Sequence, residues 1–359
     1  MNRLLVRQPG DLTADWLTEV LATSETSDTS LIGPGVSVTS CEATPVGTGQ
    51  MADTLRLAFT TSEGSTGSVV VKLASADPTS RATGVLVRAY DVEVGFYAQV
   101  APSLGLRVPA CHLAVIDEGA EWFTLVLEDV ADGVQGDQLA GCTPDVASAA
   151  LTEMALLHGT AWSRGDLATL PFLDRRSPAG DQMTIDLVTS VWPGFVERYH
   201  SMISPEHLEV AQRLVVHITD WMASRPPGET VTHGDFRLDN LLVGADRPVV
   251  VDWQTAIWGS AATDVAYFLG GSLTPADRRR HGRDLVAGYH QALMTSGASD
   301  LTLEQLHDDV AAAAPWGLVM CIVPAMIVRR TDRGDAMFTT SMARYADQVL
   351  ELGSLDTYT

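Results

Sequence analysis

One polar segment in the second half of the chain constrains the fold more than any other. It reads Thr-His-Gly-Asp-Phe-Arg-Leu-Asp-Asn over residues 232–240, and two short β-rich runs follow it at 241–243 and 249–251. The stretch between the runs, Gly-Ala-Asp-Arg-Pro, is turn-forming, so the runs are expected to pair as a hairpin. Asn240 precedes the first strand of that hairpin and Asp252 follows the second. The hairpin therefore predicts that these two side chains lie beside each other.

The residue types of this segment match one kind of chemistry. The amide oxygen of Asn240 and the carboxylate of Asp252 are hard oxygen ligands of the kind that Mg²⁺ prefers. Asp235 is placed to accept a proton from a substrate hydroxyl, and His233 is expected either to orient the loop or to contact phosphate. Taken singly, each residue would more often belong to a polar turn or a strand end. The joint spacing predicts a phosphoryl-transfer site that uses Mg²⁺.

A lysine and a glutamate upstream supply the next parts of a nucleotide site. Residues 69–71 are a continuous β-branched run, typical of a buried strand, and Lys72 follows directly. An ammonium group at that position requires a charge partner. Glu93 lies among apolar residues in a segment of helical composition and is the expected partner, with a solvated helix glutamate as the alternative. Lys72 is then expected to bind the α and β phosphates of ATP.

The intact His-x-Asp-x-x-x-x-Asn pattern at 233–240 resembles the aminoglycoside phosphotransferase and choline kinase group, which is similar in fold to the protein kinases. The Glu-Val-Gly-Phe-Tyr run at 93–97, the Asp-Trp-Gln at 252–254 and the segment 259–264 look most like the ecdysteroid kinase-like (CHK kinase-like) branch. The resemblance covers residues 35–350. It implies an α+β, protein kinase-like fold of two lobes. It also implies ATP as phosphoryl donor, with GTP as an alternative.

The same resemblance assigns expected roles to three other segments. Gly47 and Gly49 lie in a loop that is expected to cover phosphates. The third glycine of the kinase loop is replaced here by alanine. An ordinary hairpin turn is the alternative. Backbone groups of Glu128 and Val130, at the end of an apolar strand, are expected to hydrogen-bond a purine edge unless this is simply an edge strand that runs into a loop. Asp264 is expected to brace the catalytic loop, or to stabilise the start of its own helix.

The length of 359 residues and the apolar fraction of 46% support two hydrophobic cores. Residues 1–35 are expected to form an N-terminal helix and a connector. Residues 36–130 are expected to form a nucleotide-binding lobe, an antiparallel sheet with one main helix. Residues 131–359 are expected to form a larger, mainly helical lobe that carries the catalytic loop and the acceptor site.

Composition bounds the partners of the chain. A formal charge of −22 argues against binding of nucleic acid, which requires a basic surface. The uncharged run 311–328 approaches the length of a membrane span, but it contains Pro315 and Pro324 and is expected to be a buried core helix, with a membrane span as the alternative. No cleavable-signal pattern is visible, and the cysteines lack paired spacing, so a cytoplasmic location is expected; the cysteines are 41, 111, 142 and 321. The chain is expected to be a monomer or a homodimer.

These observations together predict an ATP-dependent O-phosphotransferase that acts on a hydroxyl of a small molecule. One alternative is an antibiotic-inactivating phosphotransferase that acts on an aminoglycoside or a macrolide. Another is a non-catalytic nucleotide-binding scaffold. A protein kinase is disfavoured because His-Gly-Asp stands in place of His-Arg-Asp and no Ala-Pro-Glu segment follows.

Overall fold

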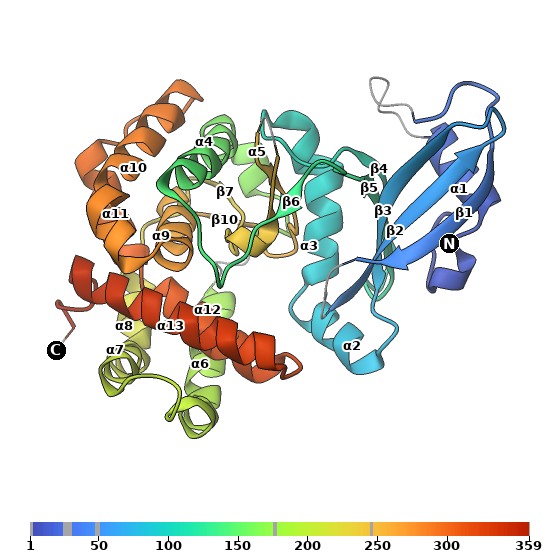
Figure 1. Ribbon diagram of the computed structural model, residues 1–359. Coiled ribbons are helices and arrows are strands. Elements are labelled where there is room, and N and C mark those ends of the chain that lie inside the picture. Colours follow the sequence, from blue (N-terminus) through green and yellow to red (C-terminus); the bar gives the residue numbers. More distant parts are fainter. Residues whose placement is uncertain (1–2, 24–30, 47–50, 175–177, 245–246, 359) are drawn as a thin grey trace. The chain divides into compact units, whose positions relative to one another are not determined.

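The computed structural model describes residues 3–23, 31–46, 51–174, 178–244 and 247–358. The chain forms two compact units (Figure 1). The first unit comprises residues 1–103, 108–132 and 250–255, and the second comprises residues 104–107, 133–249 and 256–359. The first unit therefore receives one short segment, 250–255, from late in the chain.

The first unit is built on a five-stranded antiparallel sheet with the strand order β1-β2-β3-β5-β4. Its central strand, β3, is the apolar run expected to be buried, and Val69, Val71 and Leu73 are fully buried there. Side chains of a strand alternate between the two faces of its sheet, so a nearly continuous apolar run is expected where both faces are covered. The strands are β1 (Val38–Pro45), β2 (Ala52–Thr61), β3 (Thr66–Ala74), β4 (Cys111–Ile116) and β5 (Phe123–Glu128).

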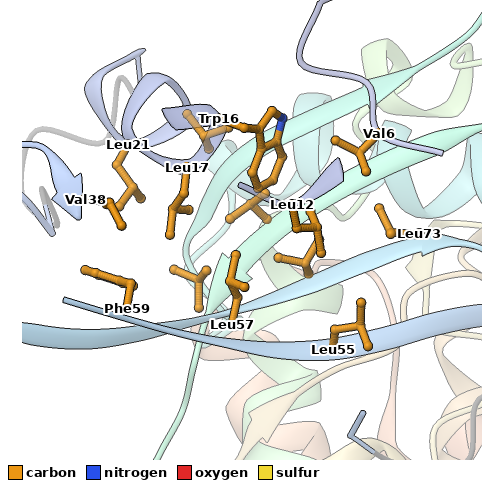
Figure 2. Packing of buried hydrophobic residues seen from close by; sticks show 14 of the residues in the cluster. Val6, Leu12, Trp16, Leu17, Leu21, Val38, Leu55, Leu57, Phe59 and Leu73 are labelled. Atoms are coloured by element: carbon orange, nitrogen blue, oxygen red, sulfur yellow. The ribbon is translucent and has the colours of Figure 1, made fainter. Parts of the chain in front are cut away.

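Helix α1 (Ala14–Thr23) covers one face of this sheet. Figure 2 shows Trp16, Leu17 and Leu21 of the helix among residues of the strands, including Leu57 and Phe59. The spacing of the helix residues places them on one apolar stripe, which must be buried against a partner. The N-terminal helix, which the sequence had set apart with its connector in residues 1–35, thus shares the core of the sheet.

Two helices and a π-helical turn follow β3 in the first unit. They are α2 (Pro78–Leu86), α3 (Ala89–Gly95) and the π-helical turn η2 (Phe96–Val100). A short 3₁₀ turn, η3 (Ala101–Ser103), comes directly after them, and another, η1 (Pro9–Asp11), precedes α1. Asp77 caps α2 by accepting a hydrogen bond from the N–H of Ser80 at 2.7 Å. Arg88, with φ of 59°, separates α2 from α3, so the helical segment expected around residues 80–100 is interrupted.

The second unit is mainly helical. Five of its helices begin at a Ser or Thr whose hydroxyl accepts a hydrogen bond from an N–H of the first turn: Thr143, Ser204, Thr274, Thr302 and Thr331. The helices are α4 (Pro144–Thr160), α5 (Gly165–Ala168), α6 (Pro178–Tyr199), α7 (Pro205–Val216), α8 (Ile218–Ser224), α9 (Ala261–Ser272), α10 (Pro275–Thr295), α11 (Leu303–Ala313), α12 (Trp316–Ile327) and α13 (Asp332–Leu352).

Short strands carry the polar segment singled out in the sequence. β7 (Thr230–Thr232) pairs with β10 (Ile257–Gly259), and β6 (Val134–Gln135), β8 (Leu241–Val243) and β9 (Val249–Val250) form a sheet of order β6-β8-β9. The predicted hairpin of the runs 241–243 and 249–251 is therefore confirmed as β8 and β9. The 3₁₀ turn η4 (Leu238–Asn240) leads into β8.

The uncharged run 311–328 forms parts of two helices rather than one, because the chain turns at Ala314-Pro315 between α11 and α12. Within the described part of the chain, the stretch Leu303–Ile327 is long and apolar enough to span a membrane by length and composition, and 56% of its most apolar window is buried.

Gly317 lets α12 approach α13 closely, since a Cβ there would lie 2.2 Å from Cδ1 of Tyr345.

Candidate active site

The loop that follows β7 is held through its backbone by Asp264, in the first turn of α9. The Asp264 carboxylate is fully buried and accepts hydrogen bonds from the N–H of His233 at 2.6 Å and of Gly234 at 2.9 Å. His233 is also fully buried, and its Nδ1 accepts from the N–H of Asp235 at 3.3 Å. The expected bracing contact of Asp264 with the loop is therefore confirmed, and His233 is placed to orient the loop.

A buried histidine extends this brace to two more helices. Nε2 of His158 (α4) lies 3.3 Å from Oδ2 of Asp264, and Nδ1 lies 2.6 Å from Oη of Tyr289 (α10). In the tautomer with its hydrogen on Nε2, His158 donates to Asp264 and its Nδ1 accepts from the tyrosine hydroxyl. Burial raises the pKa of Tyr289 well above its usual value. The place of His158 in this chain of contacts depends on the packing of α4, α9 and α10.

Asp235 lies in this braced loop, and its carboxylate accepts hydrogen bonds from three side chains. Tyr267 donates to Oδ1 at 2.9 Å, while Arg237 Nε and Asn240 Nδ2 lie 3.2 Å and 3.1 Å from Oδ2. Asn240 Nδ2 also donates to the main-chain oxygen of Asp235 at 2.8 Å. The side chain of Asp235 is 16% exposed. A carboxylate held in this way is fixed in position yet reachable from solvent.

Arg237 links two acids of the loop. Its Nε faces Asp235, and its Nη1 donates to Oδ2 of Asp239 at 3.0 Å and lies 3.0 Å from Sδ of Met337. Although burial opposes its charge, the attraction of Asp235 and other groups raises the pKa of Arg237. The sequence analysis above did not single out Arg237. The one feature of the sequence that could have indicated Arg237 is its position two residues after Asp235.

In the first unit, Lys72 lies between two carboxylates. Its Nζ is 2.6 Å from Oε1 of Glu93, on α3, and 2.9 Å from Oδ1 of Asp252. The predicted Lys72–Glu93 ion pair is confirmed, and Asp252 joins it as a second partner that was not foreseen. Burial opposes the charged ammonium, but the attraction of Asp252 and then of Glu93 outweighs it and raises the pKa of Lys72. The ammonium of Lys72 is thus held protonated.

Asp252 has a strained backbone that its neighbours hold in place. Its φ is 66°, in the left-handed region that non-glycine residues seldom adopt. The next residue, Trp253, is fully buried and stacks on Phe96 of the π-helical turn, with ring centroids 3.9 Å apart and planes 4° apart. The side chain of Gln254 donates to Oδ2 of Asp252 at 3.3 Å. Stacking and hydrogen bonds together compensate for the strain at Asp252.

The segments expected to meet the nucleotide base and phosphates are described in part. Gly47 and Gly49 lie outside the described residues. The N–H of Glu128 donates to the main-chain oxygen of Ala110 at 2.8 Å, so a contact of Glu128 with a purine would use its carbonyl group. Val130 follows the end of β5 and is half-buried.

The two expected metal ligands fall in different units, Asn240 in the second and Asp252 in the first. Among the residues that the structure describes, no group of three or more His, Cys, Asp and Glu side chains could hold a metal ion by itself. The donor chemistry still fits Mg²⁺, because the amide nitrogen of Asn240 is used by Asp235 and leaves the amide oxygen for a cation. Mg²⁺ in such sites takes one or two protein ligands together with substrate phosphates.

The chain matches the family model of the phosphotransferase enzyme family over residues 43–299. Its fold is similar to that of choline kinase from Cryptosporidium parvum Iowa II, at 12% identity and a TM-score of 0.56, covering 89% of this chain and 91% of that chain. It is similar to an ethanolamine kinase of Plasmodium vivax at 11% identity and a TM-score of 0.52, covering 88% and 84%. It is also similar to an amicoumacin kinase at 12% identity and a TM-score of 0.50, covering 85% and 88%. No curated protein matches the sequence.

Proposed function

Because the chain belongs to the phosphotransferase enzyme family, we propose that it transfers the γ-phosphoryl group of ATP to a hydroxyl group of a small molecule. The observation that carries this proposal is the Asp235 carboxylate, fixed by three hydrogen-bond donors in a loop that Asp264 braces. A general base must be held in a fixed position, in contact with the substrate, before it can act. The arrangement around Asp235 meets the requirement of a fixed position.

On the donor side, Lys72 binds the α and β phosphates through its ammonium group, which Glu93 and Asp252 orient. The residues that would hold Mg²⁺ are Asn240, through its amide oxygen, and Asp252, through its carboxylate. When bound, Mg²⁺ neutralises the negative charge on the phosphate oxygens. Support for nucleotide use comes from the structurally similar amicoumacin kinase, which was solved with the ATP analogue AMP-PNP. ATP is the proposed donor, and GTP is the alternative.

On the acceptor side, Asp235 aligns the acceptor hydroxyl and takes its proton as the oxygen attacks the γ phosphorus. The bond between the γ phosphorus and the bridging oxygen breaks, and ADP leaves with the electron pair. Asp264 keeps the loop in place through its backbone; His233 orients the loop through the N–H of Asp235, with contact to phosphate as the alternative role. The protein contributes chiefly position and charge, as expected for phosphoryl transfer.

The proposed acceptor is a small molecule rather than a protein. After Asp252, strand β10 begins at Ile257 and helix α9 begins at Ala261, so the interval has no room for a long peptide-docking segment. Two aromatic residues contact the loop of Asp235 and are proposed as walls of the acceptor site: Tyr267 through its hydroxyl, and Trp316 through Nε1, 3.4 Å from the main-chain oxygen of Gly234. Trp258 instead donates to the main-chain oxygen of Gly228, away from Asp235.

The location of the protein and its partners also belong to this proposal. We infer a cytoplasmic monomer or homodimer that binds neither nucleic acid nor a membrane. An antibiotic-inactivating phosphotransferase is the same chemistry with an aminoglycoside or macrolide acceptor. A non-catalytic scaffold would not need the three donors that orient Asp235.

The test is release of ADP from Mg·ATP by the purified protein with a panel of hydroxylated acceptors: aminoglycosides, macrolides, choline-like amines, sterols and sugars. We expect one class to stimulate ADP release. Asp235→Asn should lower turnover with that acceptor by about two to four orders of magnitude, the usual contribution of a positioned general base, while nucleotide binding is retained. Normal turnover of the variant would remove Asp235 from the role of base. A parallel panel of nucleotides decides between ATP and GTP.

A further inference from the structure

The two oxygens of the Asp235 carboxylate have different surroundings. Oδ2 accepts from both Arg237 and Asn240, and Oδ1 accepts from Tyr267. A carboxylate oxygen has two lone pairs in the plane of the group. Among the contacts of the described residues, Oδ2 is therefore saturated, whereas Oδ1 retains one lone pair. A proton from an acceptor hydroxyl is best received at Oδ1.

Tyr267 is built to be a fixed donor at this oxygen. It lies on α9, one turn after Asp264, and is 6% exposed. Its ring stacks on that of Tyr345, with centroids 5.2 Å apart and planes 9° apart. Burial, and then the negative charge of Asp235, raise the pKa of Tyr267 well above its usual value. The hydroxyl therefore keeps its hydrogen, and the stacked ring cannot easily turn away.

We propose that Tyr267 is a positioning residue whose hydroxyl, by donating to Oδ1 of Asp235, directs the remaining lone pair of that oxygen toward the acceptor hydroxyl. This inference rests on the proposed function, because it needs Asp235 to be the base. Donors on both oxygens prevent rotation of the carboxylate about its Cβ–Cγ bond. Without the tyrosine hydroxyl, Arg237 and Asn240 would hold Oδ2 alone, and Oδ1 could swing.

Helix α9 thus contacts the loop of Asp235 through two of its side chains. Asp264, at the start of α9, fixes the backbone of His233 and Gly234, and Tyr267 fixes the side chain of Asp235. A misplacement of a reacting group by about 1 Å can cost roughly 100-fold in rate. The hydroxyl of Tyr267 is therefore expected to matter for turnover and much less for binding.

The experiment compares Tyr267→Phe with a matched control, Tyr199→Phe. Tyr199 is 1% exposed, and its hydroxyl donates to Oδ1 of Asp335 at 2.7 Å, so the control also removes one buried tyrosine–carboxylate hydrogen bond. For Tyr267→Phe we expect kcat to fall by about 10- to 100-fold, with the KM of the acceptor and the affinity for Mg·ATP within about twofold of wild type. For Tyr199→Phe we expect a comparable loss of thermal stability and an unchanged kcat.

A double-mutant cycle with Asp235→Asn tests whether Tyr267 acts through Asp235. Residues that act as a unit give non-additive losses. Tyr267→Phe should therefore add no more than about a twofold loss to Asp235→Asn. Additive losses in the cycle, or a kcat of Tyr267→Phe equal to that of Tyr199→Phe, would overturn the proposal.

The outcomes separate this inference from the proposed function. If Asp235→Asn turns over normally, the proposed base is wrong; if it is inactive and Tyr267→Phe is normal, only the role of Tyr267 is wrong. Should Tyr267→Phe not fold, 3-fluorotyrosine placed at position 267 alone keeps the ring and the hydrogen bond but changes the strength of the donor. A change in kcat with unchanged KM then supports the proposal, and an unchanged kcat overturns it.

Discussion

Lys72 is the only lysine in the sequence, and all other residues of the Lys and Arg class are arginines. The structure gives a reason for the exception. A lysine ammonium is compact and has three donors, so it can contact the two separate carboxylates of Glu93 and Asp252 at once. The planar fork of arginine favours two parallel bonds to one carboxylate instead. The position therefore selects lysine on geometry as well as charge.

Removal of the Lys72 charge is expected to destabilise the protein. In Lys72→Met, the Glu93 carboxylate, which is 1% exposed, has no cation beside it. The free energy of unfolding should fall by about 3 kcal/mol. This value is at the low end of the range for buried ion pairs, because the side chain of Asp252 is 32% exposed. Urea unfolding measures this loss. The control Arg164→Met removes a cation that is 36% exposed and whose partner, Asp166, is 63% exposed, and it should cost less than about 1 kcal/mol.

A second variant of the pair separates charge from packing. Lys72→Met combined with Glu93→Gln leaves no uncompensated charge on α3 and should be more stable than Lys72→Met alone. Neither variant should bind nucleotide normally. If the double variant is less stable than the single one, the buried charge of Glu93 is not what the lysine compensates.

At the scale of elements, α12 and α13 approach each other at a glycine that also supports the active site. A Cβ at Gly317 would lie within 2.2 to 2.6 Å of ring atoms of Tyr345, which is 1% exposed. Tyr345 stacks on Tyr267, and Tyr267 binds Asp235. The contact between the two helices is therefore connected to the carboxylate of the proposed base through two stacked rings.

Gly317→Ala is expected to destabilise the protein by about 1–3 kcal/mol, the usual cost of overpacking, and also to lower turnover. The matched control is Gly288→Ala on α10, where a Cβ would meet nothing within 4 Å. Because alanine favours a helix over glycine, this control should stabilise by about 0.5–1 kcal/mol and leave turnover unchanged. Thermal unfolding and ADP release measure both effects. Equal behaviour of the two variants would contradict the close approach of α12 and α13.

At the scale of the whole molecule, buried tyrosines are expected to make the free energy of unfolding fall at high pH. Burial raises the pKa of six tyrosines, two in the first unit and four in the second: Tyr90, Tyr97, Tyr199, Tyr267, Tyr289 and Tyr345. In the unfolded chain these phenols titrate near pH 10. Above that pH the unfolded state releases protons that the folded state retains, so stability is lost as the pH rises.

The protein is therefore expected to unfold cooperatively at alkaline pH rather than to titrate gradually. Tyrosinate absorbance at 295 nm should rise in a step above pH 10 that coincides with the loss of helical circular dichroism. In concentrated guanidinium chloride, which unfolds the chain, the same absorbance should follow a simple titration near pH 10. A gradual rise in absorbance, with circular dichroism still native, would show that the phenols are accessible in the folded protein.

Local patterns in the sequence were sufficient for much of the fold and part of the site. The hairpin β8–β9, the buried strand β3 and the Lys72–Glu93 pair were predicted because each follows from short-range periodicity or from a single charge that requires a partner. Membership in the phosphotransferase family agrees with the resemblance carried by the motif at 233–240. Such features are encoded within a few residues, so no knowledge of the tertiary packing was needed.

The tertiary structure decided which distant side chains complete the site. Tyr267 is 32 positions from Asp235, and Asp252 is 180 positions from Lys72, so neither contact has a local pattern. Helix α1 belongs to the core of the first unit because its apolar stripe needs a sheet to cover, which its own sequence does not identify. The sequence by itself determined which polar residues the loop carries, whereas the packing of α9 determined which oxygen of Asp235 accepts a hydrogen bond from Tyr267. Hydrogen bonds between distant segments form only when the helices that carry them are packed.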